Sequence, residues 1–234
     1  LKFLKVIMRR PKGLWWCLLV AAGCGTGAVQ VVPSSTLAAT TTMTVSSTTV
    51  AVDLSEVEEV GNLSRDHTPF DVDYATVPPS GGDHFDVWHN CGVYSVELHD
   101  EMAVHSLEHG TVWVTYLPSL NEDNVSYLAE LFSSNEKLLM SPYPKQLAPV
   151  VVTSWGRRLE IQEVDDPRIL AFVEAFTDAE DSPEPGVRCT DGLGVPPDEP
   201  FAPAKSLGVQ GFDDGLMEAW VGRYGAASLS GNVS

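Results

Sequence analysis

Between residues 97 and 176 the sequence alternates between helix and strand patterns, and this order restricts the folds open to the chain. Hydrophobic periodicity and β-branched runs predict, in order, a helix over 97–110, a strand in 111–118, a helix in 119–135, a strand in 137–144, a hairpin over 149–162 and a helix over 165–176. The chain before this stretch is rich in loops. We therefore predict an α+β fold, a single small domain.

The last six of these elements run strand–helix–strand–strand–strand–helix, which resembles a thioredoxin-like core without its Cys-x-x-Cys motif. The resemblance implies a fold and no activity. At the helix ends we expect Gly110 to follow the first helix as its C′ residue, Ser119 with Glu122 to cap the second, and Asp166 to cap the third.

The first 24 residues read as a signal peptide. A basic stretch leads into "GLWWCLLVAA", ten mostly apolar residues that are too few to span a bilayer. The ending "AAGC" is similar to the lipobox of bacterial lipoproteins, which predicts lipidation of Cys24, export, and anchoring to the cell membrane. Ordinary cleavage nearby, or an uncleaved short anchor, is the alternative.

The remaining chain divides by composition. Residues 25–54 form a Ser/Thr-rich tether, since eleven of the eighteen residues in 33–50 are Ser or Thr. We place the globular domain at 55–190 and expect the Pro/Gly-rich acidic tail, 191–234, to be mobile. Beyond Cys24 there are 9 basic against 32 acidic residues, and such a surface repels nucleic acid. The sequence identifies no protein partner.

Two cysteines lie in the predicted domain, Cys91 and Cys189. In an exported protein a lone pair of cysteines is typical of a structural disulfide, which here closes a loop of about 98 residues. A thiolate metal site or a redox pair is the alternative.

Seven motifs follow one another in a recognisable order: "PPSGGDH", "NCGVY", "VHSLEHGTVWVTY", "SPYP", "SWGRRL", "DDPR" and "PEPGVRC". Together they resemble a bacterial family known as domain of unknown function 3105, over roughly residues 60–190. Members of that family are typically exported or membrane-tethered. The resemblance implies signature polar positions at His84, Cys91, His105, Glu108, His109 and Cys189, with His67 as a further match.

All six histidines lie between positions 67 and 109, and His105 and His109 are four residues apart. On a helix this spacing puts two imidazoles on one face, with Cβ atoms about 5–6 Å apart. Neutral imidazole is a ligand for zinc and copper. We predict a transition-metal site, Cu or Zn, formed by His84, His105 and His109. Glu108 and His67 are further ligands, and Met102 or Met140 would serve a soft Cu(I) ion.

Two other interpretations stay open. The string "HSLEH" (105–109) fits the H-x-x-E-H pattern of inverzincins, in which the glutamate acts as a base. No motif marks the downstream carboxylate that such a hydrolase requires, and Gly110 ends the helix abruptly. Alternatively the histidines only brace loops in a non-catalytic interaction or scaffold module. The sequence leaves enzymatic activity uncertain and favours a protein that is not an enzyme.

Overall fold

The structure is a computed structural model, and it describes residues 51–203. The predicted signal peptide (1–24) with Cys24, residues 25–50 and residues 204–234 lie outside the described residues. Within 51–203, none of the helices has the length and apolar character needed to cross a membrane.

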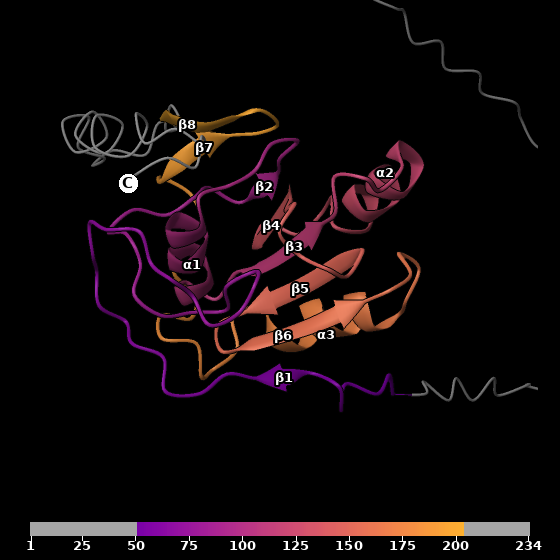
Figure 1. Cartoon of the computed structure of the whole chain (residues 1–234), viewed down its shortest axis with the longest axis horizontal. Helices are drawn as coiled ribbons and strands as arrows, with labels where there is room; N and C mark the ends of the chain where they lie inside the picture. The colour runs from indigo at the N-terminus through magenta and orange to yellow at the C-terminus, as the bar shows by residue number, and fades with distance from the viewer. Residues whose placement is uncertain (1–50, 204–234) are drawn as a thin grey trace, which may run out of the picture. The chain divides into compact units, whose positions relative to one another are not determined.

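A six-stranded mixed sheet forms the centre of the domain (Figure 1). Its strands lie in the order β1 (Glu58–Glu59), β6 (Arg157–Ile161), β5 (Val150–Ser154), β3 (Val112–Tyr116), β4 (Leu138–Pro142) and β2 (Gly92–Val93). β3 is parallel to β4 and antiparallel to β5. The helices are α1 (Asp100–Glu108), α2 (Glu122–Leu131) and α3 (Arg168–Phe176).

The three helices cover both faces of the sheet. Because side chains alternate along a strand, Val112 and Val114 of β3 point to one face and Trp113 to the other. The first face packs against α2 and α3, through Leu128, Phe132, Ile169 and Phe172. The second packs against α1, through Val104 and Leu107. α1 is thus held between the sheet and the N-terminal loops, so its polar residues are buried.

The predicted α+β class and the order of the elements are confirmed. The strand–helix–strand–strand–strand–helix order runs from β3 to α3, and its likeness to a thioredoxin-like core stays a prediction. Helix ends differ from expectation in detail. The N-cap of α2 is Asn121, whose side chain accepts a hydrogen bond from the Asn124 amide, and not Ser119. The N-cap of α3 is Pro167 and not Asp166, although the Asp166 side chain accepts a hydrogen bond from the Arg168 amide.

The ordered chain continues past residue 190, where we predicted the domain to end. β7 (Leu193–Val195) and β8 (Glu199–Pro203) form an antiparallel hairpin. Leu193 is fully buried, and the Asn90 side chain donates hydrogen bonds to the carbonyls of Gly192 and Gly194. The Pro-rich composition of this stretch concealed the hairpin, because the partner side chains lie about a hundred residues earlier in the chain.

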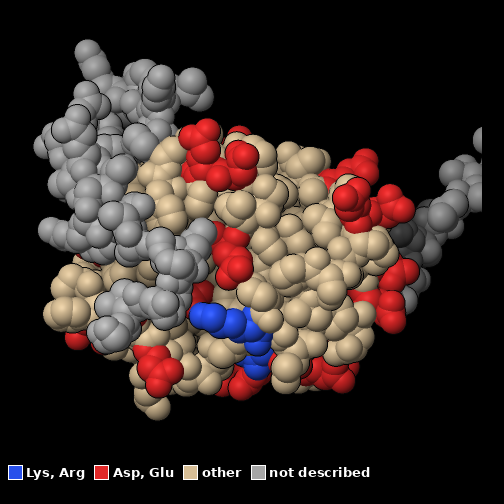
Figure 2. Space-filling view, turned by 45° about the horizontal axis from the view of Figure 1, so that its top comes forward, with Lys and Arg blue, Asp and Glu red and all other residues tan. Residues whose placement is uncertain are grey.

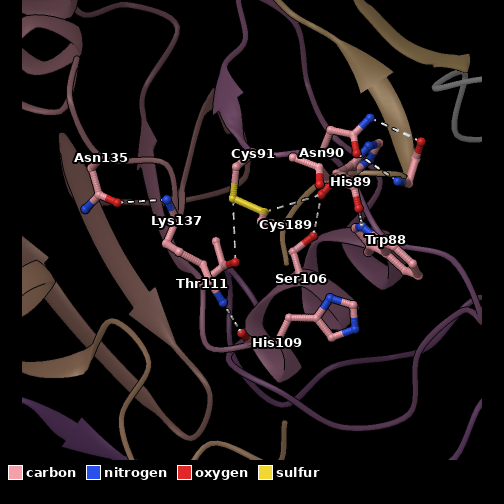
Figure 3. Close-up of a disulfide and its surroundings, with 12 residues drawn as sticks. Trp88, His89, Asn90, Cys91, Ser106, His109, Thr111, Asn135, Lys137 and Cys189 are labelled. Atoms are coloured by element: carbon pink, nitrogen blue, oxygen red, sulfur yellow. Dashed lines mark hydrogen bonds between the residues drawn. A yellow bond between two sulfur atoms is a disulfide. The ribbon is translucent and has the colours of Figure 1, made fainter. Parts of the chain in front are cut away.

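Cys91 and Cys189 are joined in a disulfide, as predicted, so neither is a free thiolate ligand (Figure 3). The Cys91 amide also donates to the Cys189 carbonyl at 2.9 Å. Sγ of Cys91 lies 3.6 Å from the Thr111 hydroxyl, just beyond the end of α1. The bond therefore ties the end of the domain to the segment that precedes β2 and lies beside α1.

Gly110 ends α1 as predicted, with a positive φ of 83°. A Cβ at this position would lie 2.6 Å from Oδ1 and 3.0 Å from the Cα of Asp178. We expect Gly110→Ala to lower the free energy of unfolding by about 1–3 kcal/mol, from left-handed strain plus this clash. Gly186→Ala is the matched control, since Gly186 has a φ of 81° and no atom within 4 Å of the added Cβ. Urea denaturation should show the larger loss for Gly110→Ala, and equal losses would contradict a role for the clash.

Candidate metal centre

Four of the predicted site residues come together beside the C-terminal part of α1. Each of His67, His84, His105 and Glu108 offers one ligand atom, and these atoms all lie within 4.8 Å of one another. The three imidazole rings have centroids 4.9–5.0 Å apart. His105 and Glu108 lie one turn apart on α1, while His67 and His84 come from two N-terminal loop segments that pair side by side.

His84 is held by the glycine-rich loop "SGGDH". Gly81 and Gly82 have φ of 139° and 124°, and a Cβ on Gly81 would lie 2.6 Å from Leu63 and 3.2 Å from the Trp155 ring. Only glycine permits this close approach. The loop aims the Gly82 carbonyl at Nδ1 of His84, which lies 2.8 Å away. A carbonyl only accepts, so Nδ1 carries the proton and Nε2 faces the centre of the cluster.

His105 is fixed in the same way. Its Nδ1 donates to the Phe85 carbonyl at 2.6 Å, which leaves Nε2 as the free ring nitrogen. Burial lowers the pKa of His105 to about 2, and neighbouring histidines add to this effect while the Phe85 carbonyl opposes it. The ring is therefore neutral at physiological pH. Backbone acceptors on Nδ1 that leave Nε2 available are the arrangement typical of metal-ligating histidines.

Glu108 brings a carboxylate to the last residue of α1. Its Oε2 lies 2.8 Å from Nε2 of His84, and its side chain is only 7% exposed. A negative charge at a helix C-terminus is disfavoured by the helix dipole. Burial adds a desolvation cost, so this carboxylate requires a positive partner. A protonated His84 or a bound cation would supply that charge.

His67 is the exposed member of the group, and it opens the cluster to solvent. Its segment pairs with that of His84 through backbone hydrogen bonds, from the Thr68 amide to the His84 carbonyl and from the His84 amide to the Asp66 carbonyl. The His67 ring stacks on His105 at 5.0 Å. An ion could thus enter from the His67 side.

Comparison with known protein families places the chain in one of them. Residues 67–191 match the family described as "Protein of unknown function (DUF3105)", which is more than half of the chain. The chain belongs to this family. No curated protein and no solved structure matches it.

In this DUF3105 chain His109 departs from its predicted place. It is the C-cap of α1, and its ring lies 4.7 Å from that of His105, so the two are neighbours as predicted. Its Nε2, however, faces Glu184 at 3.5 Å, and its ring contacts Trp88 at 4.8 Å. The geometry groups His67, and not His109, with His84 and His105. The helix ends one residue before His109, so helical spacing no longer governs where its ring points.

This placement also bears on the H-x-x-E-H interpretation. That pattern requires both histidines of the string on one ion and the glutamate beside them as a base. Within residues 51–203, Glu108 joins His105 in the group and His109 does not. The two predicted methionine ligands lie in the apolar core, Met102 against Phe85 and Leu193, and Met140 on the α2–α3 side of the sheet.

The DUF3105 domain carries a second group that the sequence did not predict. Asp71, His99 and Glu101 also place one ligand atom each within 4.8 Å of one another. No periodic pattern marks Asp71, which lies in an irregular loop, and the "HDE" string of residues 99–101 resembles an ordinary acidic helix start. The remaining histidine, His89, is fully buried and accepts a hydrogen bond from the His99 amide at 3.0 Å.

Proposed function

We propose that this protein is an exported, membrane-anchored member of its family that binds a divalent transition-metal ion, Zn²⁺ or Cu²⁺, through His67, His84, His105 and Glu108. The observation that carries the proposal is the convergence of three imidazoles and one carboxylate within 4.8 Å. Nitrogen and oxygen donors of this kind suit both ions in their divalent state. The absence of thioether among these four donors favours Cu²⁺ over Cu⁺.

The tautomers of the two buried histidines support this function. A ring nitrogen fixed by a backbone carbonyl orients its partner nitrogen toward one point before the ion arrives, which reduces the ordering cost of binding. Both His84 and His105 have this arrangement. A loop-bracing role alone would be served by the carbonyl contacts and by the contact of His84 with Glu108, but it leaves the closeness of His67 and His105 to this pair unexplained.

The buried carboxylate of Glu108 gives independent support for metal binding. Glu108 forms an ion-pair contact with His84, and this pair alone would be sufficient if the histidines were only structural. That pairing requires a charged imidazole in a buried place, next to two further imidazoles. A divalent ion neutralises the carboxylate and leaves all three rings neutral, which matches the depressed pKa of His105.

The location at the cell membrane is supported by the lipobox-like "AAGC" ending and by the disulfide, which persists in oxidising compartments. The excess of acidic over basic residues argues against nucleic acid as a partner. Figure 2 shows acidic side chains spread over one face of the domain, with basic side chains gathered at one place. Cations are attracted to such a surface, although salt screens the effect.

The decisive test is His67→Ala, because this ligand is exposed and its loss leaves the buried core intact. Loss of a ligand should weaken Zn²⁺ binding at least as much as loss of an outer partner, by about 10–100-fold or more. Arg65→Ala, another exposed side chain of the same loop, is the matched control and should bind as the wild type does. The affinity is measured on the metal-free full chain by competition with a chromophoric chelator, for Zn²⁺ and then Cu²⁺.

Two results would overturn the metal function. In the first, the wild-type chain binds neither ion above the level of the chelator blank, which favours the scaffold alternative. In the second, His67→Ala and Arg65→Ala bind equally well, which places any bound ion elsewhere. His109→Gln separates the predicted and observed ligand sets, since it should retain wild-type affinity within a few-fold.

A further inference from the structure

The second cluster lies at the other end of α1 from the first. Asp71 comes from the loop that follows His67, His99 is the N-cap of α1, and Glu101 is in its first turn. His105 follows His99 by six positions, which corresponds to about 9 Å along a helix axis. The two groups therefore share a helix and a loop but no side chain.

Glu101 is a buried, ionised carboxylate. Its side chain is 5% exposed, and Oε1 accepts a hydrogen bond from the Val72 amide at 2.7 Å. Burial would raise its pKa, but the contact with His99 and the Val72 amide outweigh that effect and lower the pKa. Oε2 points the other way, toward His99. One oxygen is thus used to hold the loop, and the second faces the cluster.

His99 presents a buried nitrogen to the same point. Its Nδ1 lies 2.7 Å from Oε2 of Glu101, an ion-pair contact. The ring is kept in place by Phe85, whose ring centroid is 5.0 Å away, and by the hydrogen bond from the His99 amide to His89. The contact places Nδ1 of His99 and Oε2 of Glu101 side by side, so that one ion would reach both atoms.

We propose that Asp71, His99 and Glu101 form a second metal site, for a divalent ion that prefers oxygen ligands, such as Mn²⁺. Two carboxylates and one imidazole are a harder donor set than the three imidazoles and one carboxylate of the first site. Two carboxylates also balance the charge of a divalent ion, and they offset the positive end of the α1 dipole, which alone would repel it. Asp71 is exposed, so water can complete the coordination.

The site would give the loop a second point of attachment to α1. In both clusters the helix side supplies buried or half-buried ligands, and the segment 67–71 supplies one exposed ligand, His67 or Asp71. Two ions would then clamp this segment along the helix. The second site goes beyond the proposed function, because its ligands are separate from those of the first.

Asp71→Asn tests the second site. The metal-free full chain is titrated with MnCl₂, and free Mn²⁺ is followed by its electron paramagnetic resonance signal. We expect the wild type to bind Mn²⁺ and Asp71→Asn to bind it at least about 10-fold more weakly. Asp73→Asn is the matched control, an exposed aspartate two residues away, and it should bind as the wild type does. Because Asp71 is exposed, an unchanged melting temperature without metal confirms that the variant folds.

The outcomes separate the two sites. If His67→Ala loses Zn²⁺ but keeps Mn²⁺, and Asp71→Asn loses Mn²⁺ but keeps Zn²⁺, both sites stand as independent sites. If the wild type binds no Mn²⁺, or if Asp71→Asn and Asp73→Asn bind it equally, the second site does not exist, and the zinc result still decides the first. If Asp71→Asn loses Mn²⁺ and His67→Ala retains Zn²⁺, the second site stands and the proposed function fails.

Discussion

Lowering the pH from 7 to 4.5 should reduce the free energy of unfolding more steeply in the wild-type protein than in His89→Gln. His89 is fully buried, and burial lowers its pKa to about 3, with the nearby His99 charge adding to the effect and the Leu193 and Pro200 carbonyls opposing it. Its Nε2 accepts the His99 amide, which requires a neutral ring. The unfolded chain takes up a proton on this histidine at about pH 6.5, and the folded chain does not.

The direction follows from that difference. The unfolded state binds more protons between pH 6.5 and 3, so stability is complete above pH 6.5 and is lost as the pH falls toward 3. The slope for one histidine is about 1.4 kcal/mol per pH unit, so the difference between wild type and His89→Gln should reach about 3 kcal/mol at pH 4.5. Glutamine keeps an acceptor for the His99 amide and does not titrate.

Other groups titrate between pH 7 and 4.5. Their contribution to stability cancels when the wild type is compared with His89→Gln. His105 and His109 have pKa values lowered by burial to about 2 and about 4, and they destabilise the fold in acid in the same direction. Burial raises the pKa of Asp100 to about 6, which acts in the opposite direction between about pH 6 and 3.8. The wild-type protein and His89→Gln both retain these groups. Urea denaturation in the presence of a chelator measures the difference, and parallel pH profiles would contradict a neutral His89.

Much of the fold was predictable from the sequence, because its information is local. Alternating Val and Trp residues in β3, and the Trp155-Gly156 turn between β5 and β6, set strands and hairpin within a few residues of chain. The β7–β8 hairpin was not predictable, since its stability comes from Asn90 and Cys91, far away in sequence. Composition alone made that stretch look like a mobile tail.

The candidate site divides in the same way. The helical spacing brought His105 and His109 close together, but the position of a ring nitrogen depends on which carbonyl holds it, and Phe85 holds only His105. His67 joins the group through pairing of two loop segments, which leaves no periodic signal. The place of Asp71 in the second group was not predictable for the same reason, since it lies in an irregular loop. The sequence pattern therefore predicts the region of the chain that forms the site. Tertiary hydrogen bonds determine which side chains in that region face one another.

Replacing both Cys91 and Cys189 by Ala should lower the free energy of unfolding by about 4–5 kcal/mol, since the bond closes a loop of nearly a hundred residues in the unfolded chain. The two cysteines are separated by 98 positions. A loss of this size is a large share of the stability of an ordinary domain. Urea denaturation at pH 7 with fluorescence of the tryptophans gives the value, and the slope of the transition reports whether the unfolded chain has expanded.

The location of the bond predicts which part of the domain loosens first. The bond lies one residue from Asn90, whose side chain holds the Gly192 and Gly194 carbonyls, so the β7–β8 hairpin keeps a second attachment. Asn90→Ala in the disulfide-free chain should then release the hairpin and expose Leu193, Met102 and Phe85, whereas Asn90→Ala with the bond intact should not. Hydrogen exchange at the Leu193 amide measures this release. A loss below about 1 kcal/mol for the double-cysteine variant would mean that the unfolded chain is already restricted without the bond.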